Sequence, residues 1–255
     1  MSIRVACINA VVIAQTSAKF VSKNNLDEIA IAWDDIDTVI LDMDGTLLDL
    51  NFDREVWNRL LPERLSELSG CSLDAAEIEV DRRLGSARGT LQWYSLDHWH
   101  ERLGVNIADL EKELEHLVQI RPGALEFLEA LSESRYRVVL ATNAQRSSMR
   151  RKLELTGIER FFDDIACAHD FGNCKEEISF WRSFTNALSI DPTRSLFIDD
   201  NQNVLETASQ FGLAYVYGIR YPSTKGTSID DPRFRCLTSF DELSFASNVN
   251  SLGEH

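Results

Sequence analysis

The segment Asp42-Met43-Asp44-Gly45-Thr46 comes directly after a short apolar run, Thr38-Val39-Ile40-Leu41. A β-branched run of this length is typical of a buried strand, and Gly45 allows the chain to turn after it. Two carboxylates this close repel each other when buried, so a cation or a shared proton is expected between them. The segment therefore predicts a strand that ends in an acidic site; the alternative is a strand followed by an ordinary acidic surface turn.

Predicted strands and helices alternate along the second half of the chain. The apolar runs that are typical of strands are 136–141, 165–168, 195–198 and 214–217. The stretches with helical periodicity are 124–132, 147–155, 177–188 and 204–211. Such alternation implies a parallel sheet with helices on both faces, so the expected fold class is α/β with a doubly wound parallel sheet.

A helical block interrupts this pattern after the first strand. The predicted helices are Arg54–Leu68, Leu73–Leu84, Leu91–Leu103 and Ile107–Val118, and Asp53 is a candidate N-cap for the first of them. The expected division of the chain is an N-terminal extension (1–32), a core (33–52 and 120–222), an inserted helical domain (53–119) and a C-terminal segment that packs on the core (223–255).

The formal net charge of the 255 residues is −15, which argues against a nucleic acid polymer or an anionic membrane surface as partner. A small phosphorylated substrate would therefore need local cations to capture it. The five cysteines are scattered and lack metal-binding spacing, which favours reduced thiols and a cytoplasmic location. No apolar stretch approaches the roughly 20 residues of a membrane helix, and Met1 to Ala18 matches a secretory signal only weakly.

Polar side chains follow the predicted strands at the points where each strand ends. They are Asp42 and Asp44, Thr142 and Asn143, and Asp199 and Asp200, while Lys175 stands in the region after the third of these strands. Because ligands of open parallel sheets bind beyond the carboxyl ends of the strands, we expect these side chains to converge. Carboxylates suit a hard cation, above all Mg²⁺, while hydroxyl, amide and ammonium groups suit a phosphoryl group. No cysteine or histidine joins the set, which argues against zinc.

The four motifs resemble those of the haloacid dehalogenase superfamily, in particular its phosphatases. The motif segments are Asp42–Thr46, Leu140–Asn143, Lys175 and Ile198–Asn201, and the resemblance covers roughly residues 33 to 222. The helical block occupies the place of the helical cap in the superfamily's first cap class. Three further segments resemble the GMP/IMP nucleotidases, which are purine 5′-nucleotidases: Leu47–Asp53, Thr90–Trp99 and Phe171-Gly172.

The resemblance implies hydrolysis of a phosphomonoester through an aspartyl-phosphate. Asp42 would be the nucleophile and Asp44 the general acid and base, and Thr142, Asn143 and Lys175 would bind the substrate. The implied cofactor is Mg²⁺, held by Asp42, Asp44 through its backbone carbonyl, and Asp200. Asp199 is the alternative ligand of the fourth motif and otherwise orients Lys175. An acid at position 44 favours phosphoryl transfer over dehalogenation.

Three functions remain open at this point. The first is a 5′-nucleotidase for purine monophosphates such as GMP or IMP, with Trp93, Tyr94, Trp99 or Phe52 in contact with the base unless these aromatics are core residues. The second is a phosphatase for another small phosphate, such as a sugar phosphate or phosphoglycolate, or a phosphomutase. The third is a catalytically silent interaction protein, which would be expected to lose the nucleophile, the acid or the lysine.

Overall fold

The computed structural model describes residues 31–243. Most of the expected N-terminal extension and the end of the expected C-terminal segment therefore lie outside the described residues. Within them, no helix has both the length and the apolar composition that crossing a membrane requires.

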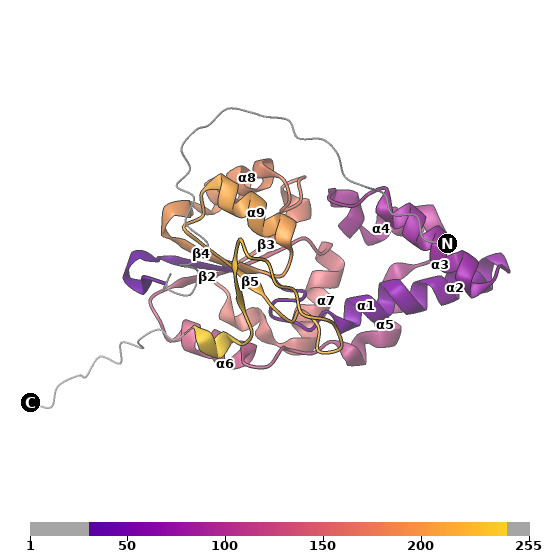
Figure 1. The fold of residues 1–255 in the computed structure, drawn as a ribbon, viewed down its shortest axis with the longest axis horizontal. Coiled ribbons are helices and arrows are strands. Elements are labelled where there is room, and N and C mark those ends of the chain that lie inside the picture. The colour runs from indigo at the N-terminus through magenta and orange to yellow at the C-terminus, as the bar shows by residue number, and fades with distance from the viewer. Residues whose placement is uncertain (1–30, 244–255) are drawn as a thin grey trace, which may run out of the picture. The chain divides into compact units, whose positions relative to one another are not determined.

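Six parallel strands form one sheet in the order β3-β2-β1-β4-β5-β6 (Figure 1). The strands are β1 (Thr38–Leu41), β2 (Arg137–Thr142), β3 (Asp164–Cys167), β4 (Ser195–Asp199), β5 (Tyr215–Ile219) and β6 (Arg235–Leu237). Leu41 at the end of β1 pairs with Leu140 of β2 and with Ile198 of β4. The carboxyl ends of the three central strands, where the polar motifs stand, therefore lie side by side.

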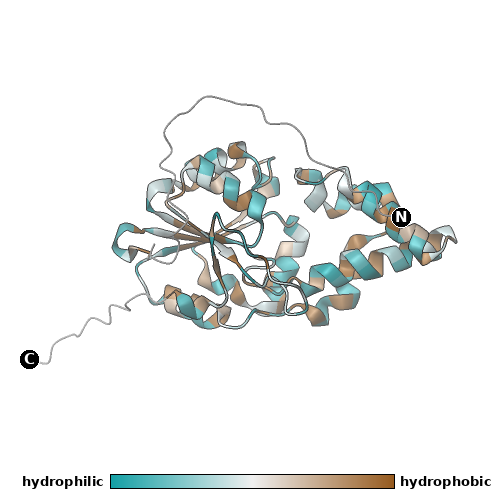
Figure 2. Ribbon diagram, in the orientation of Figure 1, coloured by the Kyte–Doolittle hydropathy of each residue, from teal (hydrophilic) through white to brown (hydrophobic). Residues whose placement is uncertain are grey.

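Helices cover both faces of the sheet. They are α6 (Ala124–Ser132), α7 (Arg146–Thr156), α8 (Ile178–Leu188) and α9 (Gln202–Phe211). Ile40 packs with α8 and α9 on one face, whereas its neighbours Val39 and Leu41 pack with α6 and α7 on the other. Both faces of each central strand are thus apolar, as the brown strands at the centre of Figure 2 show. The predicted doubly wound α/β fold is confirmed.

Five helices between β1 and α6 form a separate layer with its own apolar cluster. They are α1 (Asn51–Glu55), α2 (Leu61–Ser69), α3 (Leu73–Gly85), α4 (Leu96–Leu103) and α5 (Ile107–Leu114), and a π-helical turn, Val56–Leu60, joins α1 to α2. We call α1–α5 the helical insert and propose that it is the expected cap domain. Its two connections to the sheet run together: Leu48 pairs with Ile120, and the Asp49 N–H donates to the Gln119 carbonyl over 2.9 Å.

Several local features differ from the predictions. The single helix expected over Leu91–Leu103 is a 3₁₀ turn, Leu91–Tyr94, followed by α4, because extended backbone at Ser95 breaks it and the Ser95 hydroxyl caps α4 at the His98 N–H. Asp53 is not an N-cap, since α1 already begins at Asn51. Strand β6 was missed because it is only three residues long and is defined by its pairing with β5.

Candidate active site

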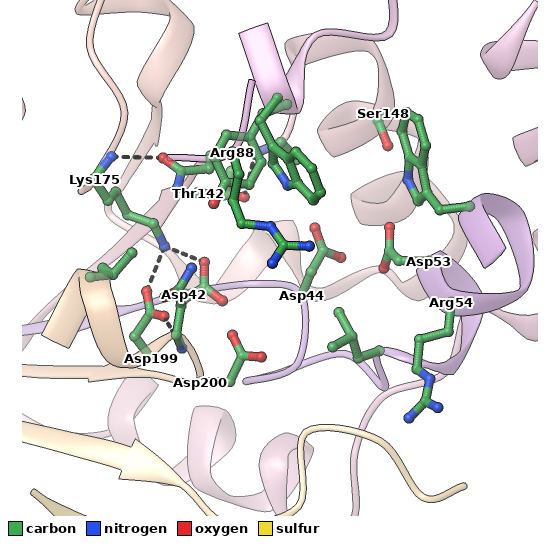
Figure 3. A pocket seen from close by; sticks show the side chains of 18 of the residues that line it. Asp42, Asp44, Asp53, Arg54, Arg88, Thr142, Ser148, Lys175, Asp199 and Asp200 are labelled. Carbon is green, nitrogen blue, oxygen red and sulfur yellow. Dashed lines mark hydrogen bonds and ion pairs between the residues drawn. The ribbon is translucent and has the colours of Figure 1, made fainter. Parts of the chain in front are cut away.

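Lys175 connects the ends of three strands. Its ammonium forms an ion pair with Asp42, which follows β1, and a second ion pair with Asp199 at the end of β4, 2.7 Å away (Figure 3). A third hydrogen bond runs to the Ala141 carbonyl in β2 over 3.0 Å. Because Lys175 is only 2% exposed, its three donors are all used inside the protein. The Asp42 N–H in turn donates to the Ile198 carbonyl over 3.0 Å, which fixes β1 beside β4.

Asp200 has the opposite character, because its carboxylate has no hydrogen bond or ion pair with any residue of 31–243. Asp42, Asp199 and Asp200 each offer an oxygen within 4.8 Å of the other two. Gly45 makes this arrangement possible: its φ is +83°, and a Cβ at this position would come within 2.5 Å of Asp200 Oδ2. The glycine of the first motif is therefore required both by its backbone conformation and by the neighbouring carboxylate.

Burial raises the pKa of Asp42 to about 7, although the charge of Lys175 opposes this rise. Burial also raises the pKa of Asp200 well above its ordinary value, and the charges of Asp199 and Asp42 raise it further. One lysine cannot balance three ionised carboxylates at this spacing, so a further cation would relieve the repulsion. A donor set made of carboxylate oxygens fits a hard divalent cation. The acidic cluster could therefore hold a metal ion.

The second motif stands at the end of β2. The Thr142 hydroxyl lines the site and accepts a hydrogen bond from the Ala144 N–H over 3.0 Å. Asn143 Oδ1 accepts from the backbone N–H of Lys175, and Asn143 Nδ2 donates to Glu176, each over 2.9 Å. The Asn143 amide thus holds the segment that carries Lys175, which sequence reasoning did not foresee. Its expected contact with substrate stays a prediction.

The strand ends open into a cavity of about 900 Å³, a volume typical of small-molecule sites. The residues of the four motifs all line this cavity, from the strand ends and the segments that follow them: Asp42, Asp44, Thr142, Asn143, Lys175, Asp199 and Asp200. The helical insert supplies much of the remaining wall, including Arg54, Trp57, Asn58, Arg88, Trp93 and Tyr94. Arg54 and Arg88 both lie at this cavity (Figure 3), and neither forms an ion pair within residues 31–243.

The aromatic residues of the insert divide into two groups. Trp93 and Tyr94 line the cavity, whereas Trp99 is 1% exposed, lies in the apolar cluster of the insert and donates to the Trp93 carbonyl over 2.9 Å. The Tyr94 hydroxyl donates to Glu176 over 2.5 Å, so the insert contacts the segment directly after Lys175. Trp57 also lines the cavity and was not singled out in the sequence.

A second buried lysine lies at the same cavity. Lys152 Nζ is 2.7 Å from Asp44 Oδ1 and 2.7 Å from Asp53 Oδ1. Burial lowers the pKa of Lys152, but the charges of Asp44, Asp53 and Glu111 outweigh that effect and hold the pKa above its ordinary value. The sequence offered no signal for this residue, because it follows Arg150 and Arg151 on a helix rich in charge.

A parallel sheet with this order, an aspartate pair after β1 and a lysine held between the first and fourth strand ends define a class of hydrolase. Residues 36–212 match the model of the haloacid dehalogenase-like hydrolases, and the chain belongs to this family. The resemblance inferred from the four motifs is confirmed, and the chain is an enzyme of this hydrolase class.

Among individual proteins, the chain is similar to the GMP/IMP nucleotidase YrfG of Escherichia coli, with 39% identity over 196 residues that cover 77% of this chain and 88% of that protein. It is 21% identical to the phosphorylated carbohydrates phosphatase of Thermotoga maritima over 227 residues, covering 82% and 96% of the two chains. The fold is shared with a haloacid dehalogenase phosphatase from Thermococcus onnurineus at a TM-score of 0.69, with 21% identity and coverage of 82% and 96%.

Proposed function

We propose that the protein is a Mg²⁺-dependent phosphomonoester hydrolase that acts on purine nucleoside monophosphates. The observation that carries the proposal is the placement of Asp42, Asp44 and Asp200 around one cavity, where the Asp200 carboxylate has no hydrogen bond or ion pair with any of the residues 31–243. A nucleophile, a proton donor two residues further on and a cation site are the groups that phosphoryl transfer through an aspartate requires.

In the proposed reaction, an Asp42 oxygen bonds to phosphorus as the bond between phosphorus and the ribose oxygen breaks. Asp44 gives its proton to that leaving oxygen. Asp44 then removes a proton from water as the water oxygen attacks phosphorus, and the Asp42 carboxylate is released with inorganic phosphate. Thr142, Lys175 and the backbone beside Asn143 are the proposed phosphoryl contacts, which stabilise charge in the transition state.

Asp42, the backbone carbonyl of Asp44, and Asp200 are the proposed ligands of Mg²⁺, which supplies positive charge against the repulsion between the phosphate and the carboxylates. Asp200 is preferred over Asp199 because both Asp199 oxygens already have partners. Asp199 Oδ2 pairs with Lys175, and Asp199 Oδ1 accepts from the Asn201 N–H over 2.7 Å. Asp199 therefore acts, in this proposal, by orienting Lys175.

The purine substrate is proposed from two supports. One is the identity of 39% to a GMP/IMP nucleotidase over most of the chain. The other is the part of the cavity wall that the insert contributes. There the Arg88 guanidinium lies 5.3 Å from the centroid of the Trp93 ring, and Trp93 offers an aromatic surface for a base. The more distant similarity to a phosphatase of phosphorylated carbohydrates keeps a sugar phosphate as the second candidate.

The test is phosphate release by the purified protein from GMP, IMP, AMP, pyrimidine monophosphates, sugar phosphates and phosphoglycolate, each with Mg²⁺ and with excess chelator. We expect the highest kcat/KM with GMP or IMP, and activity only with Mg²⁺. A sugar phosphate as best substrate would replace the purine assignment, and full activity in chelator would overturn the metal assignment. No release from any substrate would support the silent interaction protein.

A further inference from the structure

Lys152 is a buried lysine that is held by two carboxylates at the edge of the cavity. The lysine comes from the middle of α7, is 3% exposed and has two carboxylate partners at 2.7 Å, Asp44 Oδ1 and Asp53 Oδ1. Its ammonium also lies 4.9 Å from the centroid of the Phe52 ring. A buried ammonium without partners is costly, so these carboxylates are what keep Lys152 in place.

The two partners belong to different parts of the fold. Asp44 stands in the turn after β1, whereas Asp53 is on α1 of the helical insert. One turn before Lys152 on α7, the Ser148 hydroxyl donates to Glu111 of α5 over 2.7 Å. This face of α7 is thus fixed against the insert at two points, and Lys152 reaches from it to Asp44. Figure 3 shows Asp44, Asp53 and Ser148 at the cavity.

The contact leaves Asp44 with one oxygen for chemistry. Oδ1 is bound to Lys152, while Oδ2 has no hydrogen bond to any residue that the structure describes. An aspartate side chain on a turn can rotate, and a proton donor must lie within hydrogen-bond reach of the leaving oxygen. An ammonium bound to Oδ1 restricts the rotation of the carboxyl group and leaves Oδ2 as the oxygen available in the cavity that Asp44 lines.

We propose that Lys152 is a positioning residue that orients the Asp44 carboxyl group for proton transfer to and from the reacting oxygens. The inference rests on the proposed function, in which Asp44 is the general acid and base. Asp53 holds Lys152 from the other side, so the orientation of Asp44 depends on the position of α1 relative to α7.

The leaving group separates this role from a merely structural one. An alkyl phosphate such as a nucleoside monophosphate needs a proton on its leaving oxygen, whereas p-nitrophenyl phosphate releases a stable phenolate without one. The kcat/KM value reports the steps up to release of the first product. A residue that acts through the general acid therefore changes kcat/KM for the alkyl ester far more than for the aryl ester.

The experiment measures kcat/KM of the full chain with both esters for the Lys152→Met variant. We expect a loss of at least about tenfold with the alkyl ester and a change of less than about threefold with the aryl ester. Lys112→Met, a lysine on the exposed side of α5, is the matched control and should change neither value. Equal losses with both esters, or no loss with the alkyl ester, would overturn the proposal.

Removal of Lys152 leaves Asp44 and Asp53 without their shared cation, so Lys152→Met could unfold the protein. The double variant Asp53→Asn/Lys152→Met removes one of the two carboxylates and should fold, as checked by thermal denaturation. It should show the same selective loss with the alkyl ester. Equal losses in this variant would also contradict the positioning role.

A double-mutant cycle separates this inference from the proposed function. Asp44→Asn should itself cause the selective loss of kcat/KM with the alkyl ester. Adding Lys152→Met to Asp44→Asn should lower this value by less than about twofold further, because both changes remove the same function, proton transfer by Asp44. Additive losses would refute the role of Lys152 while leaving Asp44 as the acid. If Asp44→Asn loses activity equally with both esters, the assignment of Asp44 in the proposed function fails and the positioning proposal fails with it.

Discussion

Asn143 Oδ1 accepts a hydrogen bond of 2.9 Å from the backbone N–H of Lys175. The side chain that follows β2 therefore holds the main chain of the residue that joins Asp42 to Asp199. Asn143 Nδ2 donates to Glu176, the next residue along, so both ends of the amide are used for the same segment. This arrangement couples the second motif to the third through the protein rather than through substrate.

Replacement of Asn143 by alanine should lower kcat by roughly 10- to 100-fold with little change in KM. The change removes the hydrogen bond that positions Lys175, and it removes no contact with the bound substrate. Steady-state kinetics with the best substrate checks this expectation. A large rise in KM at constant kcat would instead identify the Asn143 side chain as a direct substrate contact.

The Asp42→Asn variant should lose turnover by at least ~10³-fold and should not form a covalent phosphate adduct, since an amide is a poor nucleophile. Folding should be retained, because Lys175 keeps its bonds to Asp199 and to the Ala141 carbonyl. Mass spectrometry of acid-quenched enzyme and a melting curve are the two measurements. Near-normal turnover would require direct attack by water on the substrate.

The two aspartates of the fourth motif should separate in their dependence on Mg²⁺. Asp200→Asn should raise the Mg²⁺ concentration for half-maximal activity by at least about 30-fold, because it removes the carboxylate that is unpaired within the described part of the chain. Asp199→Asn should mainly lower kcat, since its carboxylate orients Lys175. Titration of activity with Mg²⁺ for both variants checks this expectation. A larger rise in the required Mg²⁺ concentration for Asp199→Asn than for Asp200→Asn would make Asp199 the direct ligand.

Mg²⁺ should stabilise the protein more at pH 8 than at pH 5.5. The pKa of Asp42, about 7 in the folded protein and near 3.8 as its ordinary value, means that the folded state binds more protons than the unfolded chain between these values. The metal-free protein therefore loses stability as the pH rises through this window, and the raised pKa of Asp200 acts in the same direction. Because protons compete with Mg²⁺ for these oxygens, its effect grows with pH.

Melting temperatures at pH 5.5, 7 and 8, each with Mg²⁺ and with chelator, check this dependence. Asp200→Asn provides the control, because it should remove most of the stabilisation by Mg²⁺ at pH 8. An equal increase in melting temperature at all three pH values would show that the metal does not displace protons from the acidic cluster.

Trp93 and Trp99 should respond differently to replacement by leucine. Trp93→Leu should lower kcat/KM for GMP or IMP by roughly tenfold or more, the equivalent of ~1.4 kcal/mol, and spare a small acyclic phosphate. Trp99→Leu should mainly lower the melting temperature, because Trp99 is buried in the apolar cluster of the insert. Equal effects of Trp93→Leu on both substrates would remove the aromatic support for a purine substrate.

The residues that the sequence could identify are those that follow strands. Asp42, Thr142 and Asp199 are predictable as neighbours because the carboxyl ends of adjacent parallel strands meet, whatever the length of chain between them. The helix α6 was likewise predicted with its observed bounds, because its apolar face has a clear period and glycine and proline precede it.

Residues whose role depends on side-chain direction were not predictable. Lys152 is the third of three consecutive basic residues on α7, and only the packing of that helix decides which of them points inward. Ser95 lies within a run of helical periodicity, and its capping bond to the His98 N–H becomes visible only in three dimensions. The direction of Lys152 is decided by tertiary packing, whereas the Ser95 cap is a local contact that the helical periodicity on both sides of Ser95 concealed.

The pairing of Leu48 with Ile120 places the exit of the chain from the sheet beside its return. The Asp49 N–H and the Gln119 carbonyl close this joint with a further hydrogen bond, while the register of β1 is set by its own pairing with β2 and β4. Exchange of the helical insert at these two adjacent positions would leave the strand ends that carry Asp42 and Asp199 in place. A new insert could thus alter the wall of the cavity while Asp42 and Asp199 keep their places, provided that it also supplies a carboxylate like Asp53 to hold Lys152 beside Asp44.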